Sequence, residues 1–228
     1  MSLAPPEGAG PLRRERLRTA RLYFACEAMP RGEDPEPLLR AVLAGGVDIV
    51  QLRDKEADRD LVERSARTFR RLCDTHSTLF VVNDDPYLAR AVGADGVHVG
   101  QDDMPPEEAR EILGPDMIVG LSTHSPEQLA ASASASVDYV SVGPIWETPT
   151  KEGRAGVGLA YVEHAAAHAP HPFFAIGGIG PGNAGDVVAA GARRLCVVRA
   201  IRDADDPLAA TEALRRALAP VGEAAPGG

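Results

Sequence analysis

The chain has 228 residues, of which 44% are hydrophobic, and its formal net charge is -9. This length and composition allow a substantial buried core, whereas the acidic balance argues against a protein that holds nucleic acid by general electrostatics. No apolar stretch approaches the roughly 18 to 20 residues that span a bilayer, and no secretory signal is expected at the N-terminus. The three cysteines, Cys26, Cys73 and Cys196, lack metal-type spacing and are most simply explained by a reducing cytoplasm.

Short apolar runs alternate with segments of helical periodicity along the whole chain. In residues 35–45, for example, Leu38, Leu39, Val42 and Leu43 recur at helical spacing before a Gly-Gly stop. The predicted elements in chain order are strand 21–25, helix 35–45, strand 47–53, helix 58–76, strand 79–82, helix 86–92, strand 96–100, helix 105–113, strand 117–121, helix 126–135, strand 137–142, helix 159–168, strand 173–176, helix 182–190, strand 195–198 and helix 207–219.

These alternating units predict an α/β fold, a single (β/α)8 TIM barrel, because no linker or second composition class interrupts them. The barrel is expected to occupy residues 19–220 as the catalytic domain. Residues 1–18 and 221–228 are predicted to be flexible tails. In this fold the active site lies at the carboxyl ends of the strands, so the residues that follow each strand are the ones that indicate function.

Two neighbouring predicted strands within residues 81–103 both end in acidic residues. The first stops at Asn-Asp-Asp (residues 83–85) and the second at Gln-Asp-Asp (residues 101–103). A short crossover helix requires parallel strands, so carboxylates from both ends can converge on one hard cation such as Mg²⁺. A single acidic end is equally well explained by solvated loop residues or helix N-caps, but two matched ends favour a cation site.

The second predicted strand carries a cationic group at its carboxyl end. Gln51, Arg53 and Lys55 occupy alternate positions and therefore project to one side of the strand. An arginine fork and a lysine point charge suit a diphosphate. A solvated cluster or salt bridges to nearby acids is the alternative, but the adjacent acidic ends favour a metal–diphosphate site.

Later strand ends indicate a second anion site. After the sixth strand, Thr148, Thr150 and Lys151 can bind a phosphate, although a flexible loop without function is the alternative. The seventh strand leads into a glycine-rich turn before a helix, and the eighth ends at Val198 and Arg199, which is the usual phosphate position of such barrels. Two anion sites in one mouth suggest alkyl transfer between two phosphorylated reactants with loss of diphosphate.

Together these motifs resemble the thiamine-phosphate synthase family, which joins a pyrimidine diphosphate to a thiazole phosphate. The resemblance covers residues 21–218 and rests on the segments QLRDK, NDD, GADGVHVGQDD, GPIWETPTK and AIGGI in the family's order. It implies a cytoplasmic, Mg²⁺-dependent transferase of thiamine biosynthesis that releases diphosphate through a dissociative, carbocation-like step. It leaves open whether the thiazole is carboxylated and whether the chain forms a homo-oligomer. No nucleic-acid or membrane partner is expected.

The resemblance also implies roles for individual residues. Asp84 and Asp103 are expected to ligate Mg²⁺, and a catalytic role falls to Arg53, Ser122 and Lys151. The pyrimidine diphosphate is expected to bind Gln51, Arg53, Lys55, Asn83, Ser122 and Lys151, and the thiazole phosphate to bind Thr148, Thr150, Gly178, Val198 and Arg199. Position 199 departs from the family, which usually has serine there, so a charged contact is expected in place of a hydroxyl or amide contact.

Three other functions are compatible with the same features. They are a regulatory relative without synthase activity, an isomerase that acts on the thiazole, and a non-catalytic barrel that senses thiamine intermediates and binds a protein partner. The presence of Asp84, Asp103 and Lys151 favours the synthase, because the other functions do not require a metal–diphosphate site. His98 and His124 lie near strand ends but are more simply explained as structural residues, and neither is assigned a role.

Overall fold

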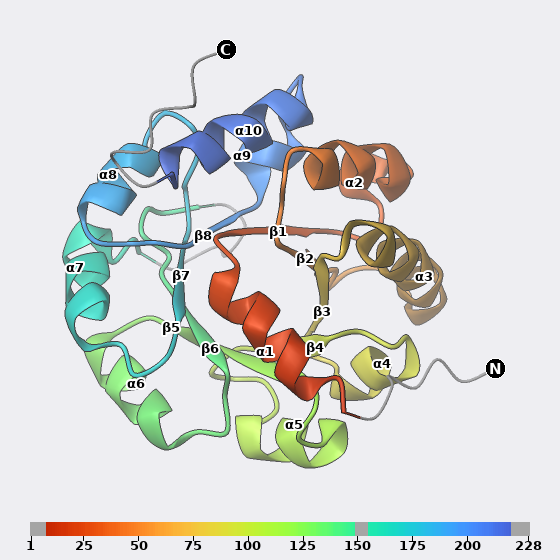
Figure 1. The fold of residues 1–228 in the computed structure, drawn as a ribbon, viewed down its shortest axis with the longest axis horizontal. Coiled ribbons are helices and arrows are strands. Elements are labelled where there is room, and N and C mark those ends of the chain that lie inside the picture. Colours follow the sequence, from red (N-terminus) through yellow and green to blue (C-terminus); the bar gives the residue numbers. More distant parts are fainter. Residues whose placement is uncertain (1–7, 149–154, 220–228) are drawn as a thin grey trace.

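The computed structural model describes residues 8–148 and 155–219, and within them eight parallel strands form one closed barrel (Figure 1). Each strand pairs with its neighbours in sequence, and β1 pairs with β8 to close the ring. The strands are β1 (Leu22–Cys26), β2 (Ile49–Leu52), β3 (Leu79–Asn83), β4 (Gly96–Val99), β5 (Ile118–Thr123), β6 (Tyr139–Val142), β7 (Phe173–Ile176) and β8 (Leu195–Val197). The predicted (β/α)8 barrel is confirmed.

Helices connect the strands and cover the outside of the barrel (Figure 1). They are α2 (Pro35–Ala44), α3 (Arg59–His76), α4 (Pro86–Ala91), α5 (Pro106–Leu113), α6 (Pro126–Ala131), α7 (Gly158–His168), α8 (Ala184–Ala189) and α10 (Pro207–Ala217). Local sequence explains where several begin: Asp58, Asp85, Ser125 and Asp206 each accept a hydrogen bond from a backbone amide of the helix that follows. The helix predicted over residues 126–135 is formed as α6 followed by the short helix η2 (Ser132–Ser134), whereas η1 (Pro30–Gly32) and α9 (Arg199–Arg202) were not predicted. Across the two described ranges, no helix combines the length and the hydropathy that crossing a bilayer requires.

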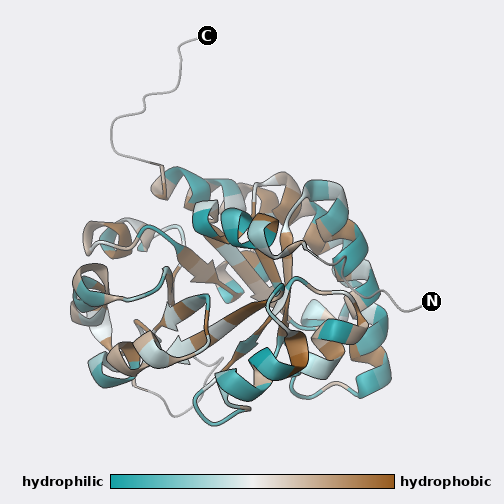
Figure 2. Cartoon of the chain, turned by 60° about the horizontal axis from the view of Figure 1, so that its bottom comes forward, coloured by the Kyte–Doolittle hydropathy of each residue, from teal (hydrophilic) through white to brown (hydrophobic). Residues whose placement is uncertain are grey.

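The alternation of side chains along each strand divides the core into two layers. Phe24 and Val50 belong to the larger cluster between the strands and the helices, whereas Tyr23 and Ile49, one residue before them, pack inside the barrel. Figure 2 shows the hydrophobic strands at the centre and the hydrophilic residues on the outer surfaces of the helices. Both faces of the sheet are therefore buried, except where the strand ends reach the mouth.

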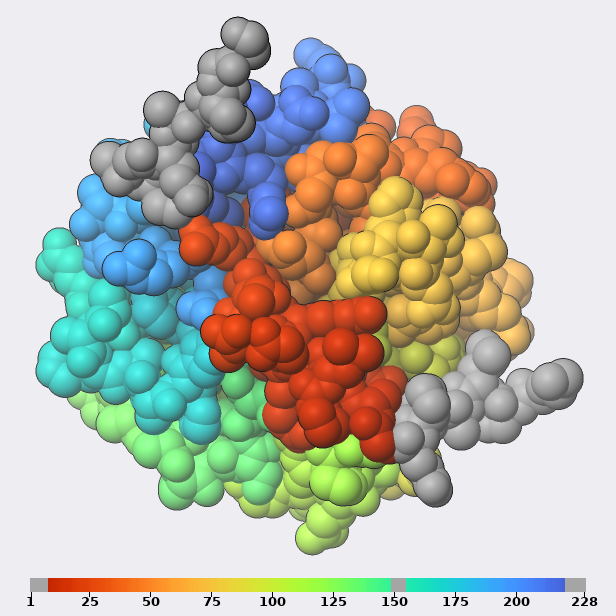
Figure 3. Space-filling model, in the orientation of Figure 1, coloured from red at the N-terminus to blue at the C-terminus, as the bar shows by residue number. Residues whose placement is uncertain are grey.

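The prediction of a flexible tail over residues 1–18 is wrong for residues 10–18, because they form α1 (Gly10–Thr19). This helix lies across the end of the barrel at which the strands begin (Figures 1 and 3), and Leu17 joins the cluster inside the barrel. Arg13 is 5% exposed and its Nε lies 2.9 Å from an oxygen of Asp95. The sequence does not reveal this helix because it is mostly polar and is held by residues far along the chain. Residues 1–7 and the tail predicted over residues 221–228 lie outside the described ranges.

Asp95 is the anchor for this end of the barrel. Its second carboxylate oxygen lies 2.8 Å from Nη1 of Arg70 on α3 and accepts the amide of Phe80 at 2.9 Å. The two carboxylate oxygens thus join α1, α3 and β3. Because the Arg13 and Asp95 side chains are only 6% and 9% exposed, removal of one partner leaves polar groups buried without full compensation.

We predict that Arg13→Ala lowers the free energy of unfolding by about 3 kcal/mol, in the range measured for broken buried ion pairs. Arg216→Ala is the matched control, since Arg216 pairs with Glu212 at the surface and such pairs contribute about 0 to 1 kcal/mol. Urea denaturation followed by circular dichroism measures both. Equal midpoints for the two variants would show that the Arg13–Asp95 contact does not stabilise the docking of α1.

Candidate active site

A cavity of about 310 Å³ opens where the strands end, and residues from all eight strands or the loops after them line it. The structure brings eleven of the predicted site residues together there: Gln51, Arg53, Lys55, Asn83, Asp84, Asp103, Ser122, Thr148, Gly178, Val198 and Arg199. Thr150 and Lys151, predicted to bind the two phosphates, lie outside the described residues. The barrel thus collects into one cavity side chains that are up to about 150 positions apart in sequence, as expected at the carboxyl ends of its strands.

The cationic and acidic side chains at the ends of β2, β3 and β4 form one cluster. Nζ of Lys55 lies 2.8 Å from Oδ2 of Asp84 and 3.8 Å from Oδ1 of Asp103. Gln51 donates to Oδ1 of Asn83 at 3.1 Å. The salt bridges that the sequence left as an alternative do form, but both acids lie in the same cavity as the lysine. The guanidinium of Arg53 lines this side as well and forms no ion pair with any residue in the described ranges.

Asp84 is held in an unfavourable conformation and environment. Its φ is 61°, in the left-handed region that is uncommon for non-glycine residues, and strain of this kind is often found at functional sites. Burial raises the pKa of Asp84, and the neighbouring carboxyl of Asp103 raises it further, while Lys55 opposes both effects. Asp103 is oriented by the amide of Gly100, which donates to its Oδ2 at 2.9 Å. Two carboxylates therefore converge beside Lys55 on one side of the cavity.

The donor set at this position fits Mg²⁺. Carboxylate oxygens are the hard ligands that Mg²⁺ prefers, and it usually takes one or two of them together with water and substrate phosphates. Within residues 8–148 and 155–219, no group of three or more His, Cys, Asp or Glu side chains could form a larger ligand set. The pair of Asp84 and Asp103, open to the cavity, therefore suits a cation shared with a phosphorylated substrate.

Asp85, the second acid of the Asn-Asp-Asp sequence at residues 83–85, does not join Asp84 and Asp103. Asp85 accepts the amide of Leu88 as the N-cap of α4, and its Oδ2 lies 3.3 Å from Nη1 of Arg59. The N-cap alternative is therefore correct for Asp85. Asp102, the neighbour of Asp103, is exposed and is not among the residues that line the cavity.

A chain of hydrogen-bonded side chains forms the floor of the cavity, and sequence analysis missed it. The hydroxyls of Tyr23 and Tyr139 lie 3.0 Å apart, and that of Tyr139 lies 3.1 Å from Nδ1 of His98. Nε2 of His98 in turn lies 3.0 Å from Oγ of Ser122. Gly120 leaves room for the ring of Tyr139, because a Cβ at position 120 would lie 2.2 Å from that ring. His98 therefore positions Ser122, and only the inward-facing parity of these strand residues signals this in the sequence.

The ends of β7 and β8 form the opposite side of the cavity. Gly177 and Gly178 have φ values of 104° and 68°. A Cβ at Gly177 would lie 2.5 Å from Cα of Pro144, so the backbone of this turn packs directly against the loop after β6. Trp146, in the same loop, is partly buried against the main hydrophobic core. The glycines therefore permit a tight turn whose backbone borders the cavity, as an anion site made of amides requires.

Arg199 stands at the start of α9, directly after Val198, and borders the same side. Its Nε donates to Oδ2 of Asp203 at 3.1 Å, one turn along the helix, and its side chain is 50% exposed. A guanidinium carries five N–H donors, so this single ion pair leaves donors that can reach an anion in the cavity. The structure thus places a cation at the position where the family resemblance predicted a departure.

Comparisons with known proteins agree with this geometry. The sequence model of the family described as thiamine monophosphate synthase matches residues 22–201. A thiamine-phosphate synthase from Thermobifida fusca is 48% identical over 207 residues, covering 90% of this chain and 95% of the relative. One from Mycobacterium bovis is 48% identical over 214 residues, covering 89% of this chain and 96% of the relative.

Solved structures show the same relationship. A thiamine phosphate pyrophosphorylase from Pyrococcus furiosus superposes with a TM-score of 0.80 at 32% sequence identity, covering 91% of this chain and 97% of that one. A 3-hexulose-6-phosphate synthase from Salmonella typhimurium has a TM-score of 0.65 at 15% identity, covering 87% of this chain and 98% of that one, and shares the fold alone. On the family match and the identity to these relatives, the chain is a transferase that belongs to the thiamine-phosphate synthase family.

Proposed function

We propose that this chain condenses 4-amino-2-methyl-5-(diphosphooxymethyl)pyrimidine with 4-methyl-5-(2-phosphooxyethyl)thiazole, or its carboxylated form, to give thiamine phosphate and diphosphate, with CO2 as a further product from the carboxylated form. Family membership supports the proposal, and one structural observation carries it. A single cavity has cations and paired carboxylates on the side of β2 to β4, and a glycine turn on the side of β7 and β8. Each side can bind the phosphate groups of one reactant, so that the two rings would lie next to each other in the centre of the cavity.

In the proposed reaction, the bond between the pyrimidine methylene carbon and the diphosphate oxygen breaks first, and its electrons leave with the diphosphate. The lone pair of the thiazole nitrogen then forms the new C–N bond with the cationic methylene carbon. Arg53 and Lys55 would neutralise the charge that develops on the leaving diphosphate, and Lys151 is proposed to assist them. Ser122, held by His98 at 3.0 Å, would help to orient the pyrimidine.

Asp84 and Asp103 are the residues proposed to hold Mg²⁺ in this reaction. Bound there, Mg²⁺ would act as a Lewis acid that stabilises negative charge on the diphosphate oxygens. Lys55 lies close to both carboxylates and therefore offsets their mutual repulsion. Gln51 and Asn83, which hydrogen bond to each other, would complete the pyrimidine diphosphate site.

The thiazole phosphate is proposed to bind on the opposite side. The turn at Gly178 would offer backbone amides, and Thr148 and Thr150 would offer hydroxyls. Val198 and Arg199 border the same region, and Arg199 would add a charged contact. A monophosphate bound in this way keeps its ester bond and acts as a handle that positions the thiazole nitrogen.

The direct test is to measure thiamine phosphate and diphosphate formed from the two purified substrates, with and without Mg²⁺. Formation of both products only when Mg²⁺ is present would support the proposal. Binding of both substrates without turnover would instead identify a regulatory or sensing relative.

We predict that Asp84→Ala and Asp103→Ala each reduce turnover at limiting Mg²⁺ by at least about 100-fold, which corresponds to a loss of about 3 kcal/mol of transition-state stabilisation. Both side chains are partly exposed at the mouth, so the fold should persist, and circular dichroism checks this. Asp102→Ala is the matched control, an exposed acid that does not line the cavity. Turnover equal to that of the control would remove the tested residue from the metal site.

We further predict that Arg199→Ser raises the KM for the thiazole phosphate about tenfold, the expected loss for one charge-assisted hydrogen bond. The KM for the pyrimidine diphosphate should stay unchanged, because Arg53 and Lys55 of that site follow β2, on the other side of the cavity from Arg199. Steady-state kinetics with each substrate varied separately gives both constants, with Arg67→Ser on the outside of α3 as control. A rise confined to the pyrimidine substrate would place Arg199 at the other anion.

A further inference from the structure

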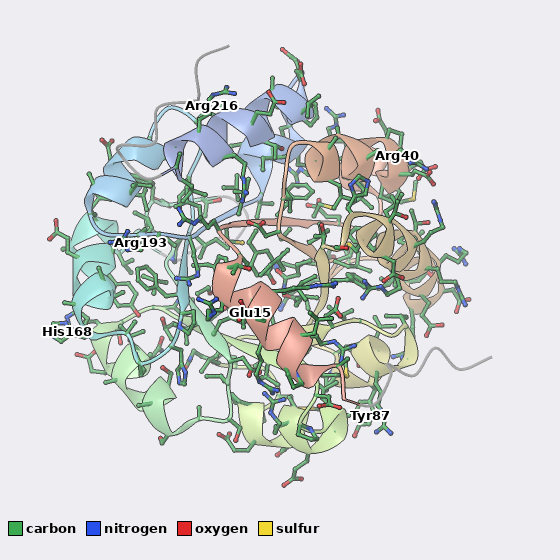
Figure 4. The ribbon with its side chains drawn as sticks, in the orientation of Figure 1. Glu15, Arg40, Tyr87, His168, Arg193 and Arg216 are labelled. Atoms are coloured by element: carbon green, nitrogen blue, oxygen red, sulfur yellow. The ribbon has the colours of Figure 1, made fainter. Side chains whose placement is uncertain are left out.

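Four arginines surround a hollow at the opposite end of the barrel, far from the proposed active site. Arg18 comes from the last turn of α1, Arg21 precedes β1, and Arg193 and Arg194 precede β8. This hollow, the arginine hollow, lies where the strands begin, whereas the active-site cavity lies where they end. Figure 4 labels Arg193, in the segment that leads into β8, and Glu15 on α1. Such a concentration of positive charge is unexpected in a chain of net charge -9.

The closure of the barrel forces two of these arginines together. Leu22 of β1 pairs with Leu195 of β8 in the parallel register, so Arg21 and Arg194, which come directly before them, are cross-strand neighbours. The amide of Leu195 donates to the carbonyl oxygen of Arg21 at 2.9 Å, which confirms their proximity. Like charges in adjacent positions on neighbouring strands are destabilising. The pKa of Arg194 is lowered by burial and also by the charges of Arg21 and Arg193.

Few of the donors in the arginine hollow are used by the protein. Arg21 donates from Nη1 to the carbonyl oxygen of Leu218, and Arg194 donates from Nη2 to that of Arg18. Nε of Arg194 is buried and has no hydrogen-bond partner among the described residues. Arg193 is exposed and forms no ion pair or hydrogen bond within the described ranges.

Acidic groups near the hollow do not balance this charge. Arg18 pairs with Glu15 at 2.7 Å, but both side chains are more than half exposed, so the pair contributes little. Asp48 accepts the amide of Arg21, but its ion pair is with Arg215 on α10. Of the four guanidinium groups, those of Arg21, Arg193 and Arg194 therefore have no acidic partner in the parts of the chain that the structure describes.

We propose that the arginine hollow is a second anion-binding site, specific for the diphosphate group of a small molecule. A diphosphate carries enough negative charge to offset three uncompensated arginines, and its oxygens accept the paired donors of a planar guanidinium. Inorganic diphosphate and a nucleoside diphosphate share this group. Its binding would relieve the repulsion between Arg21 and Arg194. The site is distinct from the mouth and does not require turnover.

The test measures binding of inorganic diphosphate by calorimetry in EDTA at low salt, with Arg53→Gln as the background to weaken binding at the mouth. In this background, Arg193→Gln should weaken diphosphate binding at least about tenfold, the loss expected for a hydrogen bond to a charged group. Arg67→Gln is the matched control, because Arg67 is exposed on α3 and removes the same charge elsewhere. The affinity of the control should equal that of the background.

A second measurement compares ligands and stability. Diphosphate should raise the Tm of the background variant and of the Arg67→Gln control more than that of the Arg193→Gln variant, because ligand that binds the folded state stabilises it in proportion to the logarithm of its affinity. Tighter binding of adenosine diphosphate than of inorganic diphosphate would identify a nucleotide as the ligand, and the reverse order would identify the inorganic ion. Equal affinities for the Arg193→Gln and Arg67→Gln variants, or no binding of either ligand to the background variant, would overturn the proposal.

Discussion

The pairing of β1 with β8 is the constraint on which the rest of the structure depends. Leu22 pairs with Leu195 and Phe24 with Val197, and this register converts a row of strand–helix units into a ring. In an open sheet, the ends of β2 and β8 would lie at different distances from β5, and no single cavity would contain them all. In the closed barrel, Lys55, Asp84 and Arg199 border the same space. The geometry of the proposed active site is therefore a consequence of closure.

Closure also determines the chemistry of the barrel interior. Alternate residues of every strand face the axis, where there is room for few side chains and no bulk water to satisfy polar groups. Near the beginnings of the strands, apolar side chains such as Ile49 and Leu79 fill the interior. Nearer the strand ends it contains His98 and Ser122, which form a hydrogen bond with each other. Burial raises the pKa values of Tyr23 and Tyr139, so both remain neutral hydroxyls that can support this chain. The floor of the cavity is thus lined by polar side chains that hydrogen bond to one another.

The two ends of the barrel use the same electrostatic principle in different ways. At the mouth, Lys55 lies between two carboxylates, so that positive and negative charges largely cancel and the site suits an anion that arrives with a cation. At the other end, Asp95 forms ion pairs with Arg13 and Arg70 and thereby holds α1, while the arginines that precede β1 and β8 lack such a partner among the described residues. A chain that is acidic as a whole can therefore contain local regions of opposite charge.

The sequence by itself determined the order and type of the main elements, the closed barrel as their arrangement and the family. Each strand begins and ends within two residues of its predicted bounds, because short continuous apolar runs and glycine stops are local signals. The clustering of Gln51, Arg53 and Lys55 with Asp84 and Asp103 was also predicted, since it follows from strand order and parity. The tertiary structure alone decided the docking of α1, the hydrogen bond between His98 and Ser122 and the juxtaposition of Arg21 with Arg194. These features depend on polar contacts between residues 24 to 173 positions apart, for which a linear pattern of hydropathy carries no signal.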